Sequence, residues 1–281
     1  METLWFIYNP RSRTADEALA RQIEDAFAKG GQPVARKLAL GDDPLPAADD
    51  LREAGVTLLV ELSGDGSINA LASSLDGWEG ALLVLPGGTM NLLSKTLHGD
   101  AAQLEIVERV LAGRCRRRTV PTIRHDGLIA YTGIIAGPTA AWGDVREDLR
   151  KGDLPALGQD AVHAVKATFD EPGVCVDGTE GDYPAIFIEP GEDALRVSAV
   201  RAAHAGDLLA HGWAWLMGDF RKGPFTPLEA AAEITLRSSG RRIELLVDGE
   251  QMKAGQPVTF SASRSTLEFV STIADESAWM S

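Results

Sequence analysis

The sequence predicts an α/β N-terminal domain with a parallel sheet, followed by a mostly antiparallel β-sandwich domain. Strand and helix patterns alternate through the first 118 residues, whereas short strands separated by turn residues predominate afterwards. The first pattern is typical of a layered α/β domain and the second of a sandwich. The length of 281 residues fits two domains at about 150 residues each. We therefore expect a boundary at residue 118, with domains at 1–118 and 119–281.

In the first domain, apolar runs bounded by turn residues predict strands at 4–8, 34–40, 56–62 and 81–85. Helical periodicity predicts helices that start after residue 14 and at 47–54, 67–75, 90–97 and 101–111. The sequence Thr14-Ala15-Asp16-Glu17 reads as a capping box that starts the first helix, and Gly30-Gly31 ends it. Each strand is followed by a helix, which predicts a parallel sheet.

In the second domain, the pattern is that of closely spaced strands. We expect them at 119–124, 128–135, 174–177, 185–188, 195–202, 233–237, 242–248, 257–261 and 266–270. Helices are expected at 161–169 and 208–217.

Composition limits the partners. There are 27 Lys and Arg residues against 41 Asp and Glu residues, a net charge of −14, which disfavours nucleic-acid binding. Cys115 and Cys175 lack metal or redox spacing and are expected to be reduced thiols of a cytosolic protein. A basic run at Arg114 to Arg118 is interpreted as a solvated edge at the domain junction, with contact to lipid headgroups as the alternative.

Membrane-spanning and targeting signals are not expected. The N-terminal METLWFIYNP starts a strand and has no basic region or cleavage site, and no uncharged stretch reaches the ~20 apolar residues of a spanning helix. We expect a cytoplasmic protein without a transmembrane segment. Peripheral binding at the inner membrane face and the oligomeric state are left open.

Three glycine-containing or polar loops follow predicted parallel strands, at 9–13, 63–67 and 86–91. Ligands of parallel α/β sheets bind at the carboxyl ends of the strands. Glycine lets the backbone approach an anion closely, and helix N-termini offer free N–H groups to phosphate. The three loops therefore predict a phosphate-binding edge, although each alone could be a plain strand-to-helix turn. No Walker loop or dinucleotide fingerprint occurs.

Two acidic motifs stand out. Asp65 lies between glycines in the middle loop, where a carboxylate would bind a cation or accept the proton of an attacking hydroxyl group, unless it is only an Asp-Gly turn residue. Asp248-Gly249-Glu250 follows an apolar strand, which alone is a common hairpin signal. Facing the loops, Asp248 and Glu250 could instead hold Mg²⁺.

Taken in order, these motifs resemble those of the diacylglycerol, sphingosine and ceramide kinase superfamily. Asn9-Pro10-Arg11-Ser12 matches its opening loop, Ser63 to Asn69 its GGDGT[ILV]NE motif, Pro86 to Asn91 its P-x-G-[TS]-x-N loop, and Asp248 to Glu250 its late DGE. The resemblance covers nearly the whole chain. It implies ATP bound between an α/β and a β-sandwich domain, and transfer of the γ-phosphoryl group to the hydroxyl group of a lipid substrate at a membrane surface.

The resemblance also assigns roles. Asp65 would be the candidate base for the acceptor hydroxyl, while Asp248 and Glu250 would act as metal ligand or as base, with Mg²⁺ as the metal. Arg150 is assigned on the resemblance alone, as a phosphate-binding arginine. Together, the loops and the resemblance give the following candidate nucleotide-binding residues: Asn9, Arg11, Ser63, Gly64, Gly66, Ser67, Gly87, Gly88, Thr89, Asn91 and Arg150.

Three positions depart from the family pattern. Ala70 replaces a glutamate, Leu92 and the following leucine replace an Asp-Phe pair, and Arg13 replaces a loop glycine. Ser63 and Leu92 are similar to the sphingosine and ceramide kinase branch, which favours a ceramide or sphingoid acceptor, with diacylglycerol next. The alternatives are a small-molecule kinase of the NAD kinase type, which shares the GGDG loop, and a nucleotide- or lipid-binding protein without turnover.

Overall fold

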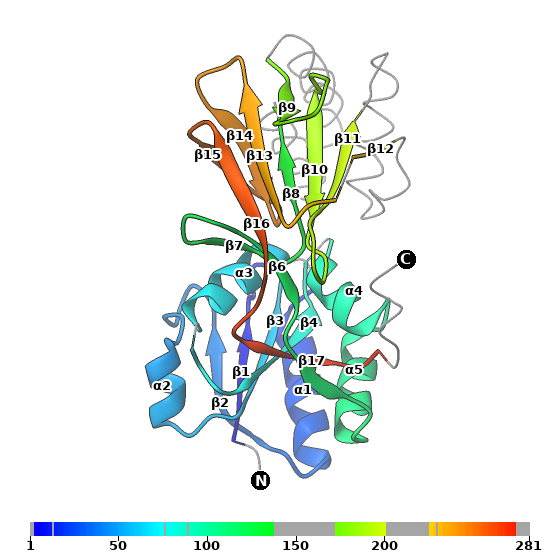
Figure 1. Ribbon diagram of the computed structural model, residues 1–281. Coiled ribbons are helices and arrows are strands. Elements are labelled where there is room, and N and C mark those ends of the chain that lie inside the picture. The colour runs from blue at the N-terminus through cyan, green and yellow to red at the C-terminus, as the bar shows by residue number, and fades with distance from the viewer. Residues whose placement is uncertain are drawn as a thin grey trace, which may run out of the picture. The chain divides into compact units, whose positions relative to one another are not determined.

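The computed structural model describes residues 3–12, 14–75, 77–88, 90–137, 172–200, 225–228 and 230–273. The chain divides into two compact units (Figure 1). The first unit comprises residues 1–120 and 265–281, and the second unit comprises residues 121–264. The first is an α/β unit with a mostly parallel sheet and the second consists of antiparallel sheets, so the predicted fold class is confirmed.

The sheet of the first unit has six strands in the order β2-β1-β3-β4-β17-β5. All neighbours are parallel except β5, which pairs antiparallel with β17. Because β1, β3 and β4 are adjacent and parallel, the loops that follow them emerge at one edge of the sheet. The strands are β1 (Leu4–Tyr8), β2 (Val34–Ala39), β3 (Leu58–Ser63), β4 (Ala81–Pro86), β5 (Arg116–Arg118) and β17 (Glu268–Ser271).

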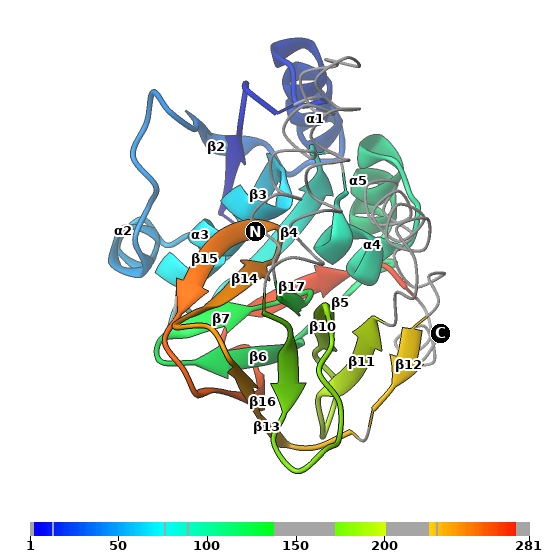
Figure 2. The ribbon, with the colours of Figure 1, turned by 90° about the horizontal axis from the view of Figure 1, so that it is seen from above.

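Among the residues that the structure describes, five helices flank this sheet. They are α1 (Glu17–Lys29), α2 (Ala48–Glu53), α3 (Asp65–Ser74), α4 (Leu92–His98) and α5 (Gln103–Leu111). Helices α1 and α5 cover one face, where Ile23 and Ile106 pack with Phe6, Val60 and Leu83 of the strands. Figure 2 shows α2 and α3 on the opposite side of the sheet. Side chains of β3 therefore alternate between the α1 side and the α3 side.

Two sequence predictions about this unit are wrong. The first helix begins at Glu17 and its N-cap is Asp16, whose carboxylate accepts a hydrogen bond from Leu19 N at 2.8 Å, so Thr14 does not start a capping box. The strand predicted at 266–270 is β17, and it belongs to the first unit and not to the sandwich. It pairs with β4 through Phe269 and Leu82, which covers an apolar strand edge that would otherwise lack a partner.

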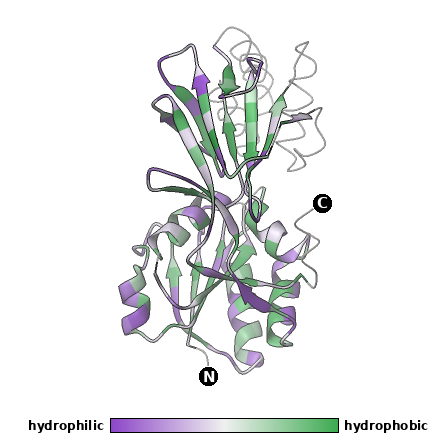
Figure 3. Cartoon of the chain, in the orientation of Figure 1, coloured by the Kyte–Doolittle hydropathy of each residue, from purple (hydrophilic) through white to green (hydrophobic). Residues whose placement is uncertain are grey.

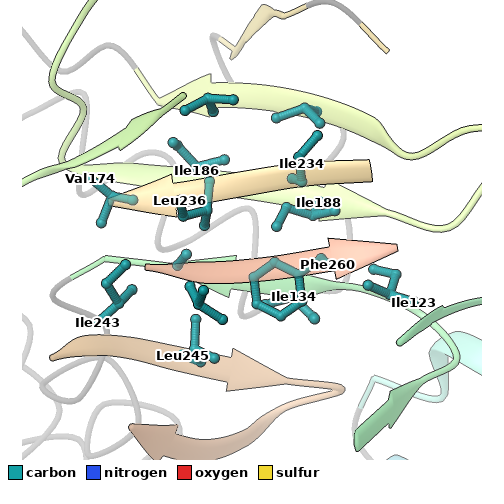
Figure 4. Close-up of a cluster of buried hydrophobic side chains, with 14 of the residues drawn as sticks. Ile123, Ile134, Val174, Ile186, Ile188, Ile234, Leu236, Ile243, Leu245 and Phe260 are labelled. Atoms are coloured by element: carbon teal, nitrogen blue, oxygen red, sulfur yellow. The ribbon is translucent and has the colours of Figure 1, made fainter. Parts of the chain in front are cut away.

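The second unit has two antiparallel sheets, in the orders β12-β11-β10-β8-β14-β15 and β7-β6-β16-β13-β9. Its core is lined by side chains from both sheets, among them Ile134, Ile186, Leu236, Leu245 and Phe260 (Figure 4). Figure 3 shows hydrophobic residues concentrated along the strands. The strands are β6 (Pro121–His125), β7 (Leu128–Ala130), β8 (Ile134–Ala136), β9 (Val174–Val176), β10 (Ala185–Glu189), β11 (Arg196–Val200), β12 (Phe225–Pro227), β13 (Glu233–Ser238), β14 (Ile243–Val247), β15 (Glu250–Ala254) and β16 (Val258–Arg264).

The prediction of a single strand at 128–135 is also wrong. It is two strands, β7 and β8, which belong to different sheets. The chain turns between them at Tyr131–Gly133, where Gly133 has a φ of 159° and a Cβ there would approach Phe187. The helices predicted at 161–169 and 208–217 lie outside the described residues. Within the described ranges, every helix is too short or too polar to cross a bilayer.

Candidate functional site

The three predicted loops are joined by backbone hydrogen bonds at the carboxyl edge of β1, β3 and β4. Asn9 N, after β1, donates to Leu62 O of β3 at 3.0 Å. Gly87 N, after β4, donates to Ser63 O at 2.9 Å, and Thr14 N donates to Gly87 O at 3.3 Å. The structure thus brings together loops that lie between residues 9 and 91, as the sequence pattern predicts.

Glycines allow two of these loops to pack backbone against backbone. A Cβ on Gly87 would lie 2.8 Å from Ser63 N, and a Cβ on Gly88 would lie 2.7 Å from Gly64 Cα. A Cβ on Gly64 would meet Gly88 Cα at 3.5 Å, which is an ordinary contact. Gly87 and Gly88 are therefore needed to build the edge itself, in addition to any close approach to an anion.

Two asparagine amides hold the loops in shape. Asn91 Oδ1 accepts from Gly88 N at 2.7 Å and its Nδ2 donates to Gly88 O at 3.0 Å. Asn91 has a φ of 52°, a left-handed conformation that Asn tolerates well. Asn9 Nδ2 donates to Ser67 Oγ at 3.2 Å, which ties the first loop to α3. Both side-chain amides therefore form hydrogen bonds that stabilise the conformation of the loops.

The remaining nucleotide-binding candidates are placed as follows. Arg11 is exposed beside Gly41 of the loop after β2. Gly66 and Ser67 lie in the first turn of α3, the helix that begins with its N-cap at Gly64. Thr89 and Arg150 lie outside the described residues.

Ser63 is fully buried, and its hydroxyl group donates to Glu61 Oε1 at 2.7 Å. Glu61 is also fully buried in β3. Burial raises the pKa of Glu61 to about 8, although the hydrogen bond from Ser63 lowers it in part. Glu61 is therefore mostly protonated at neutral pH. The sequence prediction missed Glu61, and its signal is a lone acidic residue inside the apolar run Leu58 to Leu62.

Asp65 is the first residue of α3, two residues before the predicted start of this helix. Its side chain is 6% exposed, and Oδ1 accepts from Leu93 N at 3.4 Å. The carboxylate thus lies near the N-terminal ends of α3 and α4, where helix dipoles stabilise negative charge.

The Asp-Gly-Glu motif of the second unit forms the hairpin between β14 and β15. Val247 pairs with Glu250, so Asp248 and Gly249 make a two-residue turn. Their φ angles are 47° and 90°, which are typical of the turn that Asp-Gly favours. The hairpin signal in the sequence is therefore confirmed.

The Asp248 carboxylate holds the turn between β7 and β8. Oδ1 accepts from Thr132 N at 2.8 Å, from Thr132 Oγ1 at 2.7 Å and from Gly133 N at 3.0 Å, while Oδ2 accepts from Tyr131 N at 2.7 Å. Asp248 is 4% exposed. A carboxylate has about four lone-pair sites, so these bonds use most of its capacity to accept.

The two expected Mg²⁺ ligands, Asp248 and Glu250, differ in exposure. Glu250 is exposed at the start of β15, and Asp248 is committed to the 131–133 turn. Within the part of the chain that the structure describes, no three His, Cys, Asp or Glu side chains gather as metal ligands. Asp248 and Glu250 therefore do not converge with a third such side chain among the described residues.

Comparison with known proteins shows what this part of the chain is similar to. Residues 3–123 match the model of the diacylglycerol kinase catalytic domain. A solved structure of a diacylglycerol kinase from Bacillus anthracis str. Sterne is 16% identical, with a TM-score of 0.68 over 96% of this chain and 97% of that chain. A second structure from the same organism is 15% identical, with a TM-score of 0.66 over 96% and 95% of the two chains. No curated protein matches the sequence.

Proposed function

Because residues 3–123 match the model of the diacylglycerol kinase catalytic domain, we propose that the chain is a lipid kinase that uses ATP to phosphorylate the hydroxyl group of a membrane lipid. The observation that carries the nucleotide site is the hydrogen-bonded edge formed by the loops after β1, β3 and β4. Phosphate binding at such an edge uses backbone N–H groups at the start of a helix, here α3. Arg11 would pair with a phosphate oxygen.

For the acceptor we place diacylglycerol first. The matched domain model is that of diacylglycerol kinase. Ser63 favours a ceramide or sphingoid acceptor on sequence grounds, and its side chain is buried against Glu61. Leu92 remains as support for the sphingoid alternative.

Asp65 is our candidate for the general base. In the reaction, the acceptor oxygen would form a bond to the γ-phosphorus while the bond from that phosphorus to the bridging oxygen of ADP breaks. The acceptor proton would pass to the Asp65 carboxylate. Mg²⁺ enters this proposal as the ion that ATP phosphates carry, because kinases hold it largely through substrate phosphates. We also propose that the protein binds at a membrane surface to reach its lipid substrate.

A phosphate-transfer assay with radiolabelled ATP tests it. The acceptors are diacylglycerol, ceramide and sphingosine in mixed micelles, and NAD in solution. We expect a labelled lipid with the wild-type protein and a loss of about 10²-fold or more in kcat for Asp65→Asn, with a smaller change in ATP affinity. The control is Asp25→Asn, an exposed aspartate on α1.

The other outcomes separate the alternatives. Transfer of the label to NAD, and not to any of the lipids, would identify a small-molecule kinase. Nucleotide binding without transfer to any acceptor would indicate a binding protein. Full turnover by the Asp65 variant would remove Asp65 as the base.

A further inference from the structure

We propose that Glu61 is a positioning residue for the nucleotide-binding edge, and that it acts through the hydroxyl group of Ser63. This inference rests on the proposed function. Glu61 Oε1 accepts the Ser63 hydroxyl hydrogen at 2.7 Å, and both side chains are fully buried. Ser63 is the last residue of β3, so the contact lies directly beneath the start of the loop.

The neighbours of Glu61 on the adjacent strands are apolar. In the sheet, Ile7 of β1 and Val84 of β4 lie beside it in register, and both are fully buried. Glu61 Oε2 has no hydrogen-bond partner among the described residues. Burying a carboxyl group in such a place is unfavourable unless it is neutral and bonded. The raised pKa of about 8 agrees with a neutral carboxyl group whose only described partner is Ser63.

Ser63 connects this buried pair to the loops. Its carbonyl oxygen accepts from Gly87 N at 2.9 Å, and its backbone is the surface on which Gly87 packs. The next residue, Gly64, is the N-cap of α3. A bond that fixes the Ser63 side chain therefore also fixes the point where two loops meet. Without Glu61, the buried hydroxyl group keeps only its longer contact to Gly64 O at 3.4 Å, and we expect Ser63 and the start of α3 to shift.

Four variants test the coupling: Glu61→Gln, Glu61→Leu, Ser63→Ala, and the double variant Glu61→Leu/Ser63→Ala. The glutamine amide oxygen can accept from Ser63 without charge, so Glu61→Gln should bind MgADP within about twofold of the wild type. Glu61→Leu leaves the hydroxyl group with only the 3.4 Å contact to Gly64 O and should weaken binding about fivefold to tenfold. Because the two residues act together, the double variant should lose no more than the larger of the two single losses. MgADP affinity is measured by calorimetry.

A control variant and a ligand-free measurement complete the experiment. Leu59→Met changes a buried side chain two residues earlier on the same face of β3 and should leave MgADP affinity unchanged. Hydrogen exchange of the amides at 64–68 should be faster in Glu61→Leu than in the wild type and in Glu61→Gln. KM for ATP should rise with Glu61→Leu more than kcat falls.

The outcomes are distinguishable. Failure of the wild type to bind MgADP would overturn the proposed function, and the exchange measurement would still decide whether Glu61 orders the loop. Unchanged exchange and affinity in Glu61→Leu, or additive losses in the double variant, would overturn the role of Glu61. If Glu61→Leu does not fold, Ser63→Ala applies the same test from the other partner.

Discussion

Asp248 offers a direct test of whether the Asp-Gly-Glu motif builds the fold or carries chemistry. In Asp248→Ala, three backbone N–H groups and one hydroxyl group at Tyr131–Gly133 lose their acceptor. A hydrogen bond to a charged group contributes about 1.5–3 kcal/mol, which would sum to roughly 6–12 kcal/mol. Such contributions are not additive, and water can reach the half-buried Thr132. We therefore expect a loss of about 3–5 kcal/mol in the stability of the second unit.

The backbone of Asp248 adds a smaller contribution. Its φ of 47° lies in the left-handed region, where alanine costs roughly 1–2 kcal/mol and asparagine less. Asp248→Asn keeps the turn but presents an NH₂ group towards N–H donors, so it should also destabilise the unit, by about 2 kcal/mol. The matched control is Glu250→Gln, two residues away and exposed, which should change stability by less than about 0.5 kcal/mol.

Urea unfolding and site-resolved hydrogen exchange at 128–136 measure these effects. We expect exchange in this segment to accelerate in both Asp248 variants and not in Glu250→Gln. Native stability and unchanged exchange in Asp248→Ala would refute the structural role that we assign to this carboxylate. Lost kinase activity in such a stable variant would instead favour a chemical role.

Two further predictions concern the first unit. Gly88→Ala places a Cβ 2.7 Å from Gly64 Cα, so calorimetric unfolding should show a loss of about 1–3 kcal/mol in stability, and MgADP affinity should weaken beyond about tenfold. The control is Gly64→Ala, whose Cβ has an ordinary 3.5 Å contact and should preserve stability. Equal losses of stability in the two variants would contradict the packing argument. Glu61 binds more protons in the folded than in the unfolded chain between its ordinary pKa near 4.5 and its folded pKa of about 8. Wild-type stability relative to Glu61→Gln should therefore fall as pH rises through this window, by at most about 1.4 kcal/mol per pH unit, and level off above pH 8; a difference independent of pH would show that Glu61 is not buried as a neutral acid.

The strands that the sequence predicted best are those with a continuous apolar pattern. The central strands β1, β3 and β4 are buried on both faces, and their residue types reveal them. By contrast, β5 consists of Arg116–Arg118, and β15 is an exposed strand at Glu250–Ala254. Both lie at sheet edges, where charged side chains are tolerated and discourage pairing with other chains, so neither has the pattern of a buried strand. The pairing of β17 with β4 is non-local and leaves no local signal.

The loops of the candidate site could be predicted from sequence because their chemistry depends on residue type and on strand ends. The direction of each side chain could not. Ser63 suits phosphate binding as a residue type, yet its hydroxyl group points to Glu61 inside the sheet. Asp248 suits a metal or a proton, yet it holds a turn more than 100 residues earlier in the chain. Such partners become visible only when the fold brings distant segments together.

The hydrogen bonds of Asp65 and Asp248 also indicate which of the two takes the proton from the lipid hydroxyl group. When a carboxylate is protonated, one of its two oxygens becomes a hydrogen-bond donor. At Asp248 that oxygen would face N–H or O–H groups of the 131–133 turn, so each turnover would disturb contacts that hold the second unit together. At Asp65, Oδ1 accepts from Leu93 N at 3.4 Å, a bond longer than each of the four at Asp248. We therefore expect activity in Asp248 variants to fall in proportion to their stability, whereas Asp65→Asn should lose turnover in a protein that remains folded.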